Sequence, residues 1–103
     1  MIARRRIGFA RVAGAALAYG DVLVLRWLPN GRRDGAEWLA LNPTRPDNTA
    51  GSFKVNIATG RWSDFATGDA GGDLVSLAAY LFRLRQSEAA VSVAQALGID
   101  PYD

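Results

Sequence analysis

Apolar side chains recur along this chain with a helical period in three stretches. In residues 7–28 they return every three or four positions, as one face of a helix requires. These positions are Phe9, Val12, Ala16, Tyr19 and Leu23. Because Gly20 and Asp21 interrupt the stretch, it could form one helix or two. The same period returns in residues 74–82 and again from Ser87 to a closing glycine, Gly98, so two more helices are expected.

Between the helical stretches the period changes to two. Phe53, Val55 and Ile57 alternate with polar residues, which is typical of a half-buried strand. A tight turn at 58–60 returns the chain along 61–65 as the second arm of a hairpin, and 37–41 predicts a further strand. Residues 67–72 are expected to form a glycine-rich loop, and Asp73 stands at the N-cap position of the following helix.

These elements predict an α+β fold with a small three-stranded antiparallel sheet, an N-terminal helix and two C-terminal helices. We expect one domain over residues 1–103, with a helical segment and turn at 1–36 and the sheet and later helices at 37–99. Half of the 103 residues are hydrophobic, which suits a folded chain. The apolar run 22–25 is far shorter than the roughly 20 residues that span a membrane, so we expect a cytoplasmic protein.

The chain contains no cysteine and no histidine. Disulfides, thiolate metal sites, cysteine nucleophiles and histidine general bases are therefore excluded. An all-oxygen site is one that zinc rarely accepts. We expect no metal, no cofactor and no enzymatic activity.

The charge is unevenly distributed. Residues 1–61 carry ten Lys and Arg against four acids, and residues 62–103 carry two against six. This asymmetry suits a basic face that meets phosphate, although ordinary solvated surface would also explain it.

One group of residues combines cations with an aromatic ring. Such a group suits single-stranded nucleic acid, because cations hold phosphates and a flat ring stacks on a base. The alternative is that Trp62 and Trp38 belong to the core. The candidate binding residues are Lys54, Arg61 and Trp62 on the predicted hairpin, with Arg32, Arg33 and Arg45 in nearby loops.

Two other groupings have simpler explanations. The glycines at 68, 71 and 72 precede a helix, as in a phosphate-binding loop, but Asp69 and Asp73 would repel phosphate there. Asp64 with these two acids lacks the spacing of a calcium loop. The glycines are better explained by a tight turn, and Asp73 by a helix cap.

Several short motifs occur in a fixed order: Ser-Phe at 52–53, a hairpin glycine at 60, an aromatic residue at 62, and Gly-Gly-Asp at 71–73. In this order they resemble the N-terminal zinc ribbon of bacterial and phage DNA primases, over about residues 39–99. That family has Cys-Pro-x-His and Cys-x-x-Cys ligand pairs. The corresponding positions here are Asn42 and Arg45, then Asp64 and Thr67, so the resemblance is to a degenerate form without zinc ligands.

The resemblance implies a function. In that family the strands of the ribbon contact single-stranded template DNA, and Lys54, Arg61 and Trp62 lie on the corresponding strands. We therefore expect a non-catalytic nucleic-acid-binding module of a phage or plasmid primase or primase-helicase. Its polymerising domain would lie beyond Ile99, so the chain alone should not make primers. The alternative is a small standalone mobile-element protein that contacts host replication or defence proteins as an inhibitor, as anti-CRISPR proteins do.

The ribbon alignment also predicts the geometry of the four former ligand positions. Asn42, Arg45, Asp64 and Thr67 should still face one another across two loops, with Arg45 and Asp64 forming an ion pair. We expect this pair near the surface, where ion pairs contribute little stability, so that Asp64→Ala should cost little.

Overall fold

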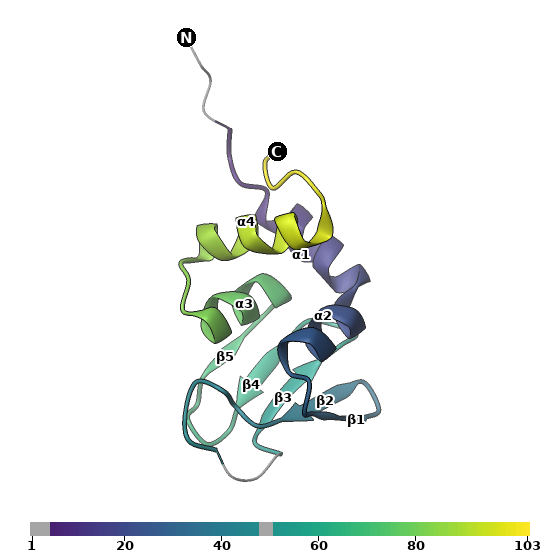
Figure 1. Cartoon of the computed structure of the whole chain (residues 1–103), viewed down its shortest axis with the longest axis vertical. Helices are drawn as coiled ribbons and strands as arrows, with labels where there is room; N and C mark the ends of the chain where they lie inside the picture. The colour runs from purple at the N-terminus through teal and green to yellow at the C-terminus, as the bar shows by residue number, and fades with distance from the viewer. Residues whose placement is uncertain (1–4, 48–50) are drawn as a thin grey trace.

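Helices and a sheet occupy different parts of the molecule, and all five strands lie next to one another (Figure 1). The structure is a computed structural model that describes residues 5–47 and 51–103. Its elements, in chain order, are α1 (Phe9–Ala18), α2 (Gly20–Trp27), β1 (Arg32–Asp34), β2 (Glu37–Ala40), β3 (Phe53–Asn56), β4 (Trp62–Asp64), β5 (Ala70–Gly71), α3 (Leu74–Phe82) and α4 (Gln86–Leu97).

The sheet has five antiparallel strands in the order β1-β2-β3-β4-β5, so the expectation of three strands was wrong. The two additional strands are the short edges. β1 lies where a polar turn was expected and pairs with β2, and β5 lies in the glycine-rich loop and pairs with β4. Charged and glycine residues have low strand propensity, but pairing with a neighbouring strand outweighs propensity.

The N-terminal helical stretch forms two helices separated at Tyr19. Gly20 begins α2 close to the sheet, where an added Cβ would lie 3.3 Å from the carbonyl oxygen of Ile57. The caps of the later helices confirm two predictions: the Asp73 carboxylate accepts from the Ser76 N–H at 2.8 Å, and Gly98 ends α4 with φ of 70°. Among the described residues, no helix has the length and apolar character needed to cross a bilayer.

The core lies between the helices and one face of the sheet. Along β3 the side chains alternate, with Phe53 and Val55 fully buried and Lys54 and Asn56 partly exposed. Because facing residues of antiparallel strands share a face, Trp62 and Asp64 of β4 point to the buried side and Ser63 points to the open side. The sheet therefore has one face against the helices and one face toward solvent.

The two ends of the described chain are joined by a short antiparallel bridge between Ile7 and Tyr102. The Gly8 N–H donates to the Pro101 carbonyl and the Asp103 N–H donates to the Arg6 carbonyl, both at 2.8 Å. The bridge lies beside α1 and α4, away from the sheet (Figure 1).

Candidate nucleic-acid interface

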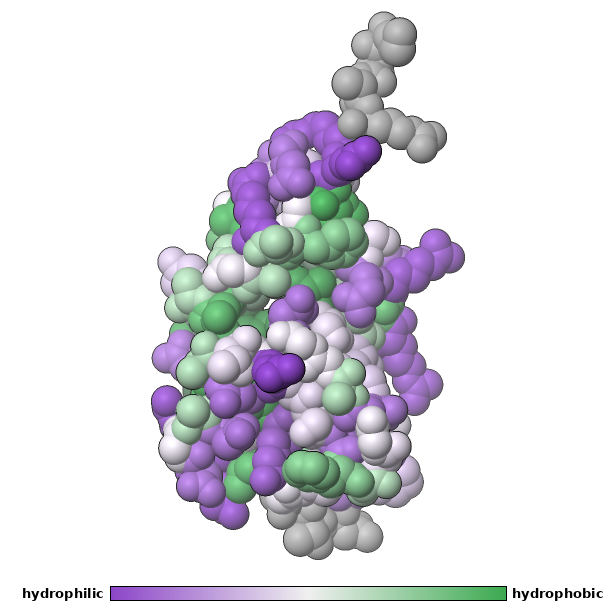
Figure 2. Space-filling model, turned by 180° about the vertical axis from the view of Figure 1, so that it is seen from behind, coloured by the Kyte–Doolittle hydropathy of each residue, from purple (hydrophilic) through white to green (hydrophobic). Residues whose placement is uncertain are grey.

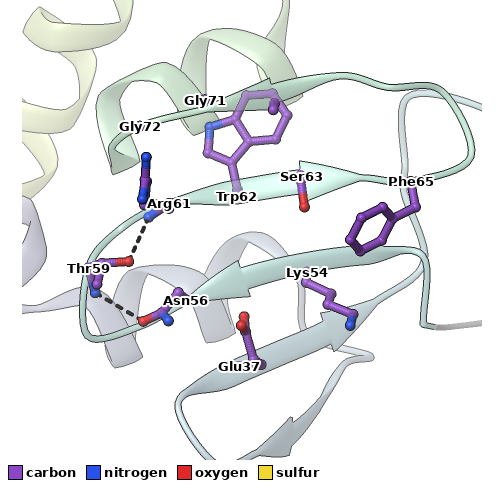
Figure 3. Close-up of a pocket in the computed structure, with 11 residues that line it drawn as sticks. Glu37, Lys54, Asn56, Thr59, Arg61, Trp62, Ser63, Phe65, Gly71 and Gly72 are labelled. Atoms are coloured by element: carbon purple, nitrogen blue, oxygen red, sulfur yellow. Dashed lines mark hydrogen bonds between the residues drawn. The ribbon is translucent and has the colours of Figure 1, made fainter.

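A hollow of about 680 Å³ lies over strands β2 to β5 (Figure 3). Side chains from three strands line it: Glu37 from β2, Lys54 and Asn56 from β3, and Ser63 from β4, with Arg61 and Phe65 flanking β4. Gly71 and Gly72 form its rim and add no side chain. Seen from behind, the lower part of the molecule is mainly hydrophilic, with a few hydrophobic residues among the polar ones (Figure 2).

The hollow combines two cations with an exposed aromatic ring. Phe65 is 74% exposed, and the Lys54 ammonium lies 5.4 Å from the centroid of its ring. Arg61 is exposed at the turn between β3 and β4. Within the described residues, neither Lys54 nor Arg61 forms an ion pair with a carboxylate. Both charges can therefore meet an anion from solvent.

Trp62 does not provide the stacking surface that the sequence suggested. It is only 5% exposed, and its ring packs against Tyr80 with centroids 4.6 Å apart. Gly71 lies so close that a Cβ there would be 2.3 Å from the indole nitrogen. The indole lies against β5 in Figure 3. Burial thus favours the core interpretation of Trp62, and the accessible ring belongs to Phe65.

Phe65 was missed by sequence reasoning, although a signal for it exists. Along β4 and just beyond, Trp62 and Asp64 are buried while Ser63 and Phe65 are not. The period of two expected of any strand, applied to the second arm of the predicted hairpin, therefore places Phe65 on the open face.

The three predicted loop cations separate. Arg32 on β1 faces Leu39, which in turn faces Lys54, so Arg32 shares the open face with Lys54. Arg33 belongs to the opposite face, and its Nε donates to the Gly35 carbonyl at 2.9 Å. Arg45 lies on the buried side, in contact with Asp64. Arg33 and Arg45 are therefore not part of the open face.

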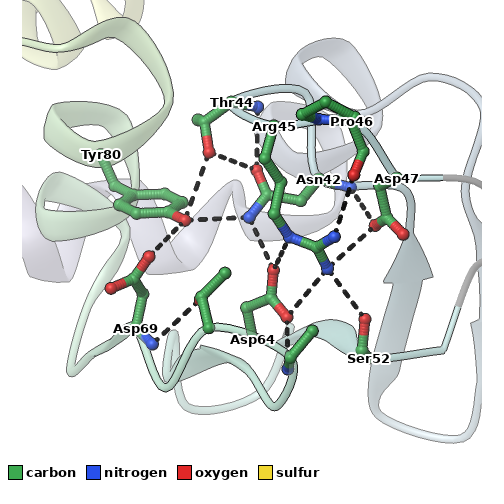
Figure 4. Close-up of polar contacts among 11 residues, drawn as sticks. Asn42, Thr44, Arg45, Pro46, Asp47, Ser52, Asp64, Asp69 and Tyr80 are labelled. Atoms are coloured by element: carbon green, nitrogen blue, oxygen red, sulfur yellow. Dashed lines mark hydrogen bonds and ion pairs between the residues drawn. The ribbon is translucent and has the colours of Figure 1, made fainter.

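Three of the four former ligand positions converge on one point (Figure 4). The Asp64 carboxylate accepts from Asn42 Nδ2 at 2.8 Å, from Arg45 Nε at 2.9 Å and from Arg45 Nη2 at 3.2 Å. It also accepts from the Ala66 N–H at 2.8 Å. Thr67 does not join this group, because its side chain is exposed and its hydroxyl accepts from the Asp69 N–H.

This polar cluster also reaches α3 through Tyr80. The Tyr80 hydroxyl accepts from Asn42 Nδ2 at 2.9 Å and donates to Asp69 at 2.7 Å. Asp47 accepts from the Asn42 N–H at 2.8 Å. No buried side-chain nitrogen or oxygen lacks a hydrogen-bond partner in residues 5–47 and 51–103. The cluster ties two loops and a helix together.

The Arg45–Asp64 pair lies deeper than expected. The side chain of Asp64 is 0% exposed and that of Arg45 is 23% exposed, so the expectation of a surface pair was wrong. Hydrogen bonding from Arg45 holds the pKa of the Asp64 carboxyl far below its usual value, and Asn42 and Ala66 act in the same direction against the opposing effect of burial. The same hydrogen bond raises the pKa of Arg45. Both groups are charged at neutral pH.

These side chains do not fit a zinc ion. Arg45 places a cation where a ligand would stand, and Asp64 already accepts hydrogen bonds from Asn42, Arg45 and Ala66. The described part of the chain contains no cluster of three or more Asp and Glu side chains that could hold a metal. The hydrogen-bonded cluster occupies the place that the sequence resemblance assigns to the metal.

Comparisons with known proteins address the fold. No protein-family model and no curated protein matches this chain. Its structure is similar to the crystal structure of the Aquifex aeolicus primase, which contains zinc-binding and RNA polymerase domains, with a TM-score of 0.73 and 22% sequence identity. The match covers 92% of this chain, which spans 22% of that primase chain. The chain has a primase-like fold.

Proposed function

We propose that this chain is a non-catalytic module that binds single-stranded DNA on the open face of its sheet. The observation that carries the proposal is the hollow of about 680 Å³, where Lys54, Arg61 and an exposed Phe65 meet on a primase-like fold. The module would serve a primase or primase-helicase of a phage or plasmid, in the cytoplasm, and would require no cofactor.

The geometry supports separate roles for the cations and the aromatic ring of the hollow. Lys54 on β3 and Arg61, in the turn just before β4, would hold successive phosphates. Phe65 would stack on a base, which contributes about 1–3 kcal/mol per base in single-strand binding proteins. The ammonium of Lys54, already 5.4 Å from this ring, lies where a phosphate next to the stacked base would meet it.

A single strand fits this arrangement better than a duplex. Only an unpaired base can expose its face to Phe65, whereas paired bases in a duplex are stacked on one another. Two cations and one ring would bind weakly, with an affinity that falls as salt is added.

The proposal is tested by titrating a labelled single-stranded oligonucleotide with the chain and following fluorescence anisotropy at several salt concentrations. The double variant Lys54→Glu/Arg61→Glu should lose most binding at low salt, for all sequences alike. Each phosphate neutralised should contribute about 0.7 to the slope of log affinity against log salt.

The matched control carries the same charge reversal on the exposed cations Arg26 and Arg83, on helix α2 and at the end of α3. This variant should keep most of the affinity. The proposal fails if the sheet variant binds as well as the parent, or if both variants lose binding equally.

A second candidate function is supported by the outer face of α2 together with the residue that precedes this helix. Tyr19, Val22 and Leu25 recur at helical spacing and are each more than half exposed. Exposed apolar side chains in a row are typical of protein contacts. In this alternative the chain would act on a replication or host-defence protein. Two results together would favour this alternative. The chain would not bind DNA at low salt, and Val22→Glu/Leu25→Glu would no longer inhibit the replication or host-defence protein that the parent inhibits.

A further inference from the structure

The hollow over the sheet is not uniformly basic, because Glu37 on β2 also lines it. Glu37 faces Asn56 on β3, and the Asn56 N–H donates to the Arg61 carbonyl at 2.7 Å. These three residues therefore form one row across three chain segments, with a carboxylate at one end and a guanidinium at the other. In Figure 3 the Glu37 carboxylate points from β2 toward β3.

No hydrogen bond or ion pair from the described residues engages the Glu37 carboxylate. Its neighbour Asn56 is occupied, since its Oδ1 accepts from the N–H groups of Ala58 and Thr59 at 2.9 and 3.0 Å. A carboxylate repels phosphate, so Glu37 does not suit the DNA backbone. The Glu37 carboxylate is thus a hydrogen-bond acceptor to which no described residue donates, and it lies beside the proposed path of the DNA strand.

We propose that Glu37 is a specificity-determining residue that accepts a hydrogen bond from the amino group of a base. This inference rests on the proposed function of the hollow. An ionised carboxylate can only accept hydrogen bonds. Cytosine and adenine offer an amino group on their Watson–Crick edge, and guanine offers one beside a ring N–H, whereas thymine and uracil offer only a ring N–H that lies between two carbonyl oxygens.

The position of Glu37 agrees with this role. Neighbouring strands are about 4.8 Å apart, so Glu37 and Arg61 lie about 10 Å apart across the sheet. A nucleotide whose phosphate meets Arg61 can extend its base over Asn56 toward Glu37. A carbonyl oxygen facing the carboxylate would be repelled, and an amino group would be bound. The hollow should therefore bind cytosine, adenine or guanine in preference to thymine or uracil.

The sharpest comparison uses oligo(dC) and oligo(dU) of equal length, because these bases differ only on the edge that Glu37 would contact. Titrations of the full chain at pH 7.5 are followed by fluorescence anisotropy. The parent should prefer oligo(dC) by about tenfold, the discrimination expected of one good base contact. In Glu37→Gln the preference should fall to nearly one, because an amide both donates and accepts.

Two further variants separate base reading from charge. Asp34 faces Glu37 on β1, so Asp34→Asn removes an equal charge next to it. That variant should bind both oligonucleotides more tightly and keep the tenfold ratio. Glu37→Asp keeps the charge but withdraws the acceptor by one methylene, so it should lower the ratio without a general gain in affinity.

The outcomes distinguish a failure of the role of Glu37 from a failure of the proposed single-stranded DNA binding. If neither oligonucleotide binds at low salt, the proposed function fails and the inference fails with it. If the parent binds oligo(dC) and oligo(dU) with the same affinity, and this binding depends on Lys54 and Arg61, only the role of Glu37 is overturned. The same holds if Asp34→Asn abolishes the preference or if Glu37→Gln retains it.

Discussion

Asp64 is the residue on which the loops around the former ligand positions depend. Its carboxylate is fully buried and accepts from Asn42, Arg45 and the Ala66 backbone. A buried charge is tolerated only when it is paired and hydrogen-bonded, and here both conditions hold. Replacing this one side chain therefore disturbs both loops at once.

Asp64→Asn should lower the free energy of unfolding by about 2–3 kcal/mol, in the range of charged hydrogen bonds and below that of a fully buried ion pair. Among the described residues, Arg45 would retain only Asp47, at 3.4 Å, as an anionic partner. Urea unfolding followed by circular dichroism measures the change. Asp34→Asn, at an exposed position, is the control and should change stability by less than about 0.5 kcal/mol. A similar small loss in Asp64→Asn would contradict the prediction.

The same carboxylate should make stability depend on pH. The pKa of Asp64 is lower in the folded chain than in the unfolded chain, so its stabilising effect is fully present above the unfolded value of about 3.9. The effect should be lost progressively as the pH falls below that value. Urea unfolding between about pH 6 and pH 2 should show a steeper acid loss in the parent than in Asp64→Asn. Parallel curves would be evidence against this assignment.

At the residue scale the sequence predicted the encounter of Asn42, Arg45 and Asp64, because the ribbon alignment placed both loops together. It did not predict their depth, since burial depends on Tyr80 and Asp47, which no local pattern connects to Asp64. The error at Trp62 arose in the same way. An aromatic residue in a strand can face either side of the sheet. The period of two was not extended to residues 62–65, where it separates the buried Trp62 from the exposed Phe65.

At the scale of elements, β5 shows how a two-residue strand can shape the sheet. It crosses the indole of Trp62, and an added Cβ at Gly71 would lie 2.1 Å from Ser76 Oγ and 2.3 Å from Trp62 Nε1. Glycine is therefore needed here for close approach. The sequence marked this segment as a turn because glycine is rare in strands, and only the packing against Trp62 reveals the pairing.

Gly71→Ala should destabilise the fold by about 1–3 kcal/mol, the usual cost of forcing an extra methyl into a packed site. Because Trp62 must move, its fluorescence should change as well. Gly72→Ala is the matched control, since nothing lies within 4 Å of a Cβ at that position. Equal effects of the two substitutions would show that β5 does not press on the indole.

At the scale of the whole molecule, the order of short motifs along the chain carried most of the information. Ser-Phe, the hairpin glycine and Gly-Gly-Asp predicted a primase-like arrangement of strands and helices, and the structural comparison supports such a fold. The edge strands β1 and β5, which the sequence did not predict, have no hydrophobic pattern of their own, so only the assembled sheet defines them. The open face likewise appears only once β1 to β5 lie side by side.

The whole fold should form without metal. A structural zinc contributes on the order of 10–16 kcal/mol in small zinc domains. In this chain we expect the hydrogen-bonded cluster around Asp64 and the core between the helices and the sheet to supply that stability instead. Thermal unfolding with and without a strong chelator should therefore give the same midpoint. A midpoint that falls on addition of chelator would contradict this prediction.

The bridge between Ile7 and Tyr102 has a practical consequence for attaching the protein to other objects. Residues near both chain ends meet beside α1 and α4, far from the open face of the sheet (Figure 1). A dye, a bead or a fused partner protein coupled at either end would leave Lys54, Arg61 and Phe65 facing solvent. Immobilisation through the ends therefore orients the molecules on a sensor surface with the sheet outward. A pulling force applied between the two chain ends would act first on the bridge between Ile7 and Tyr102.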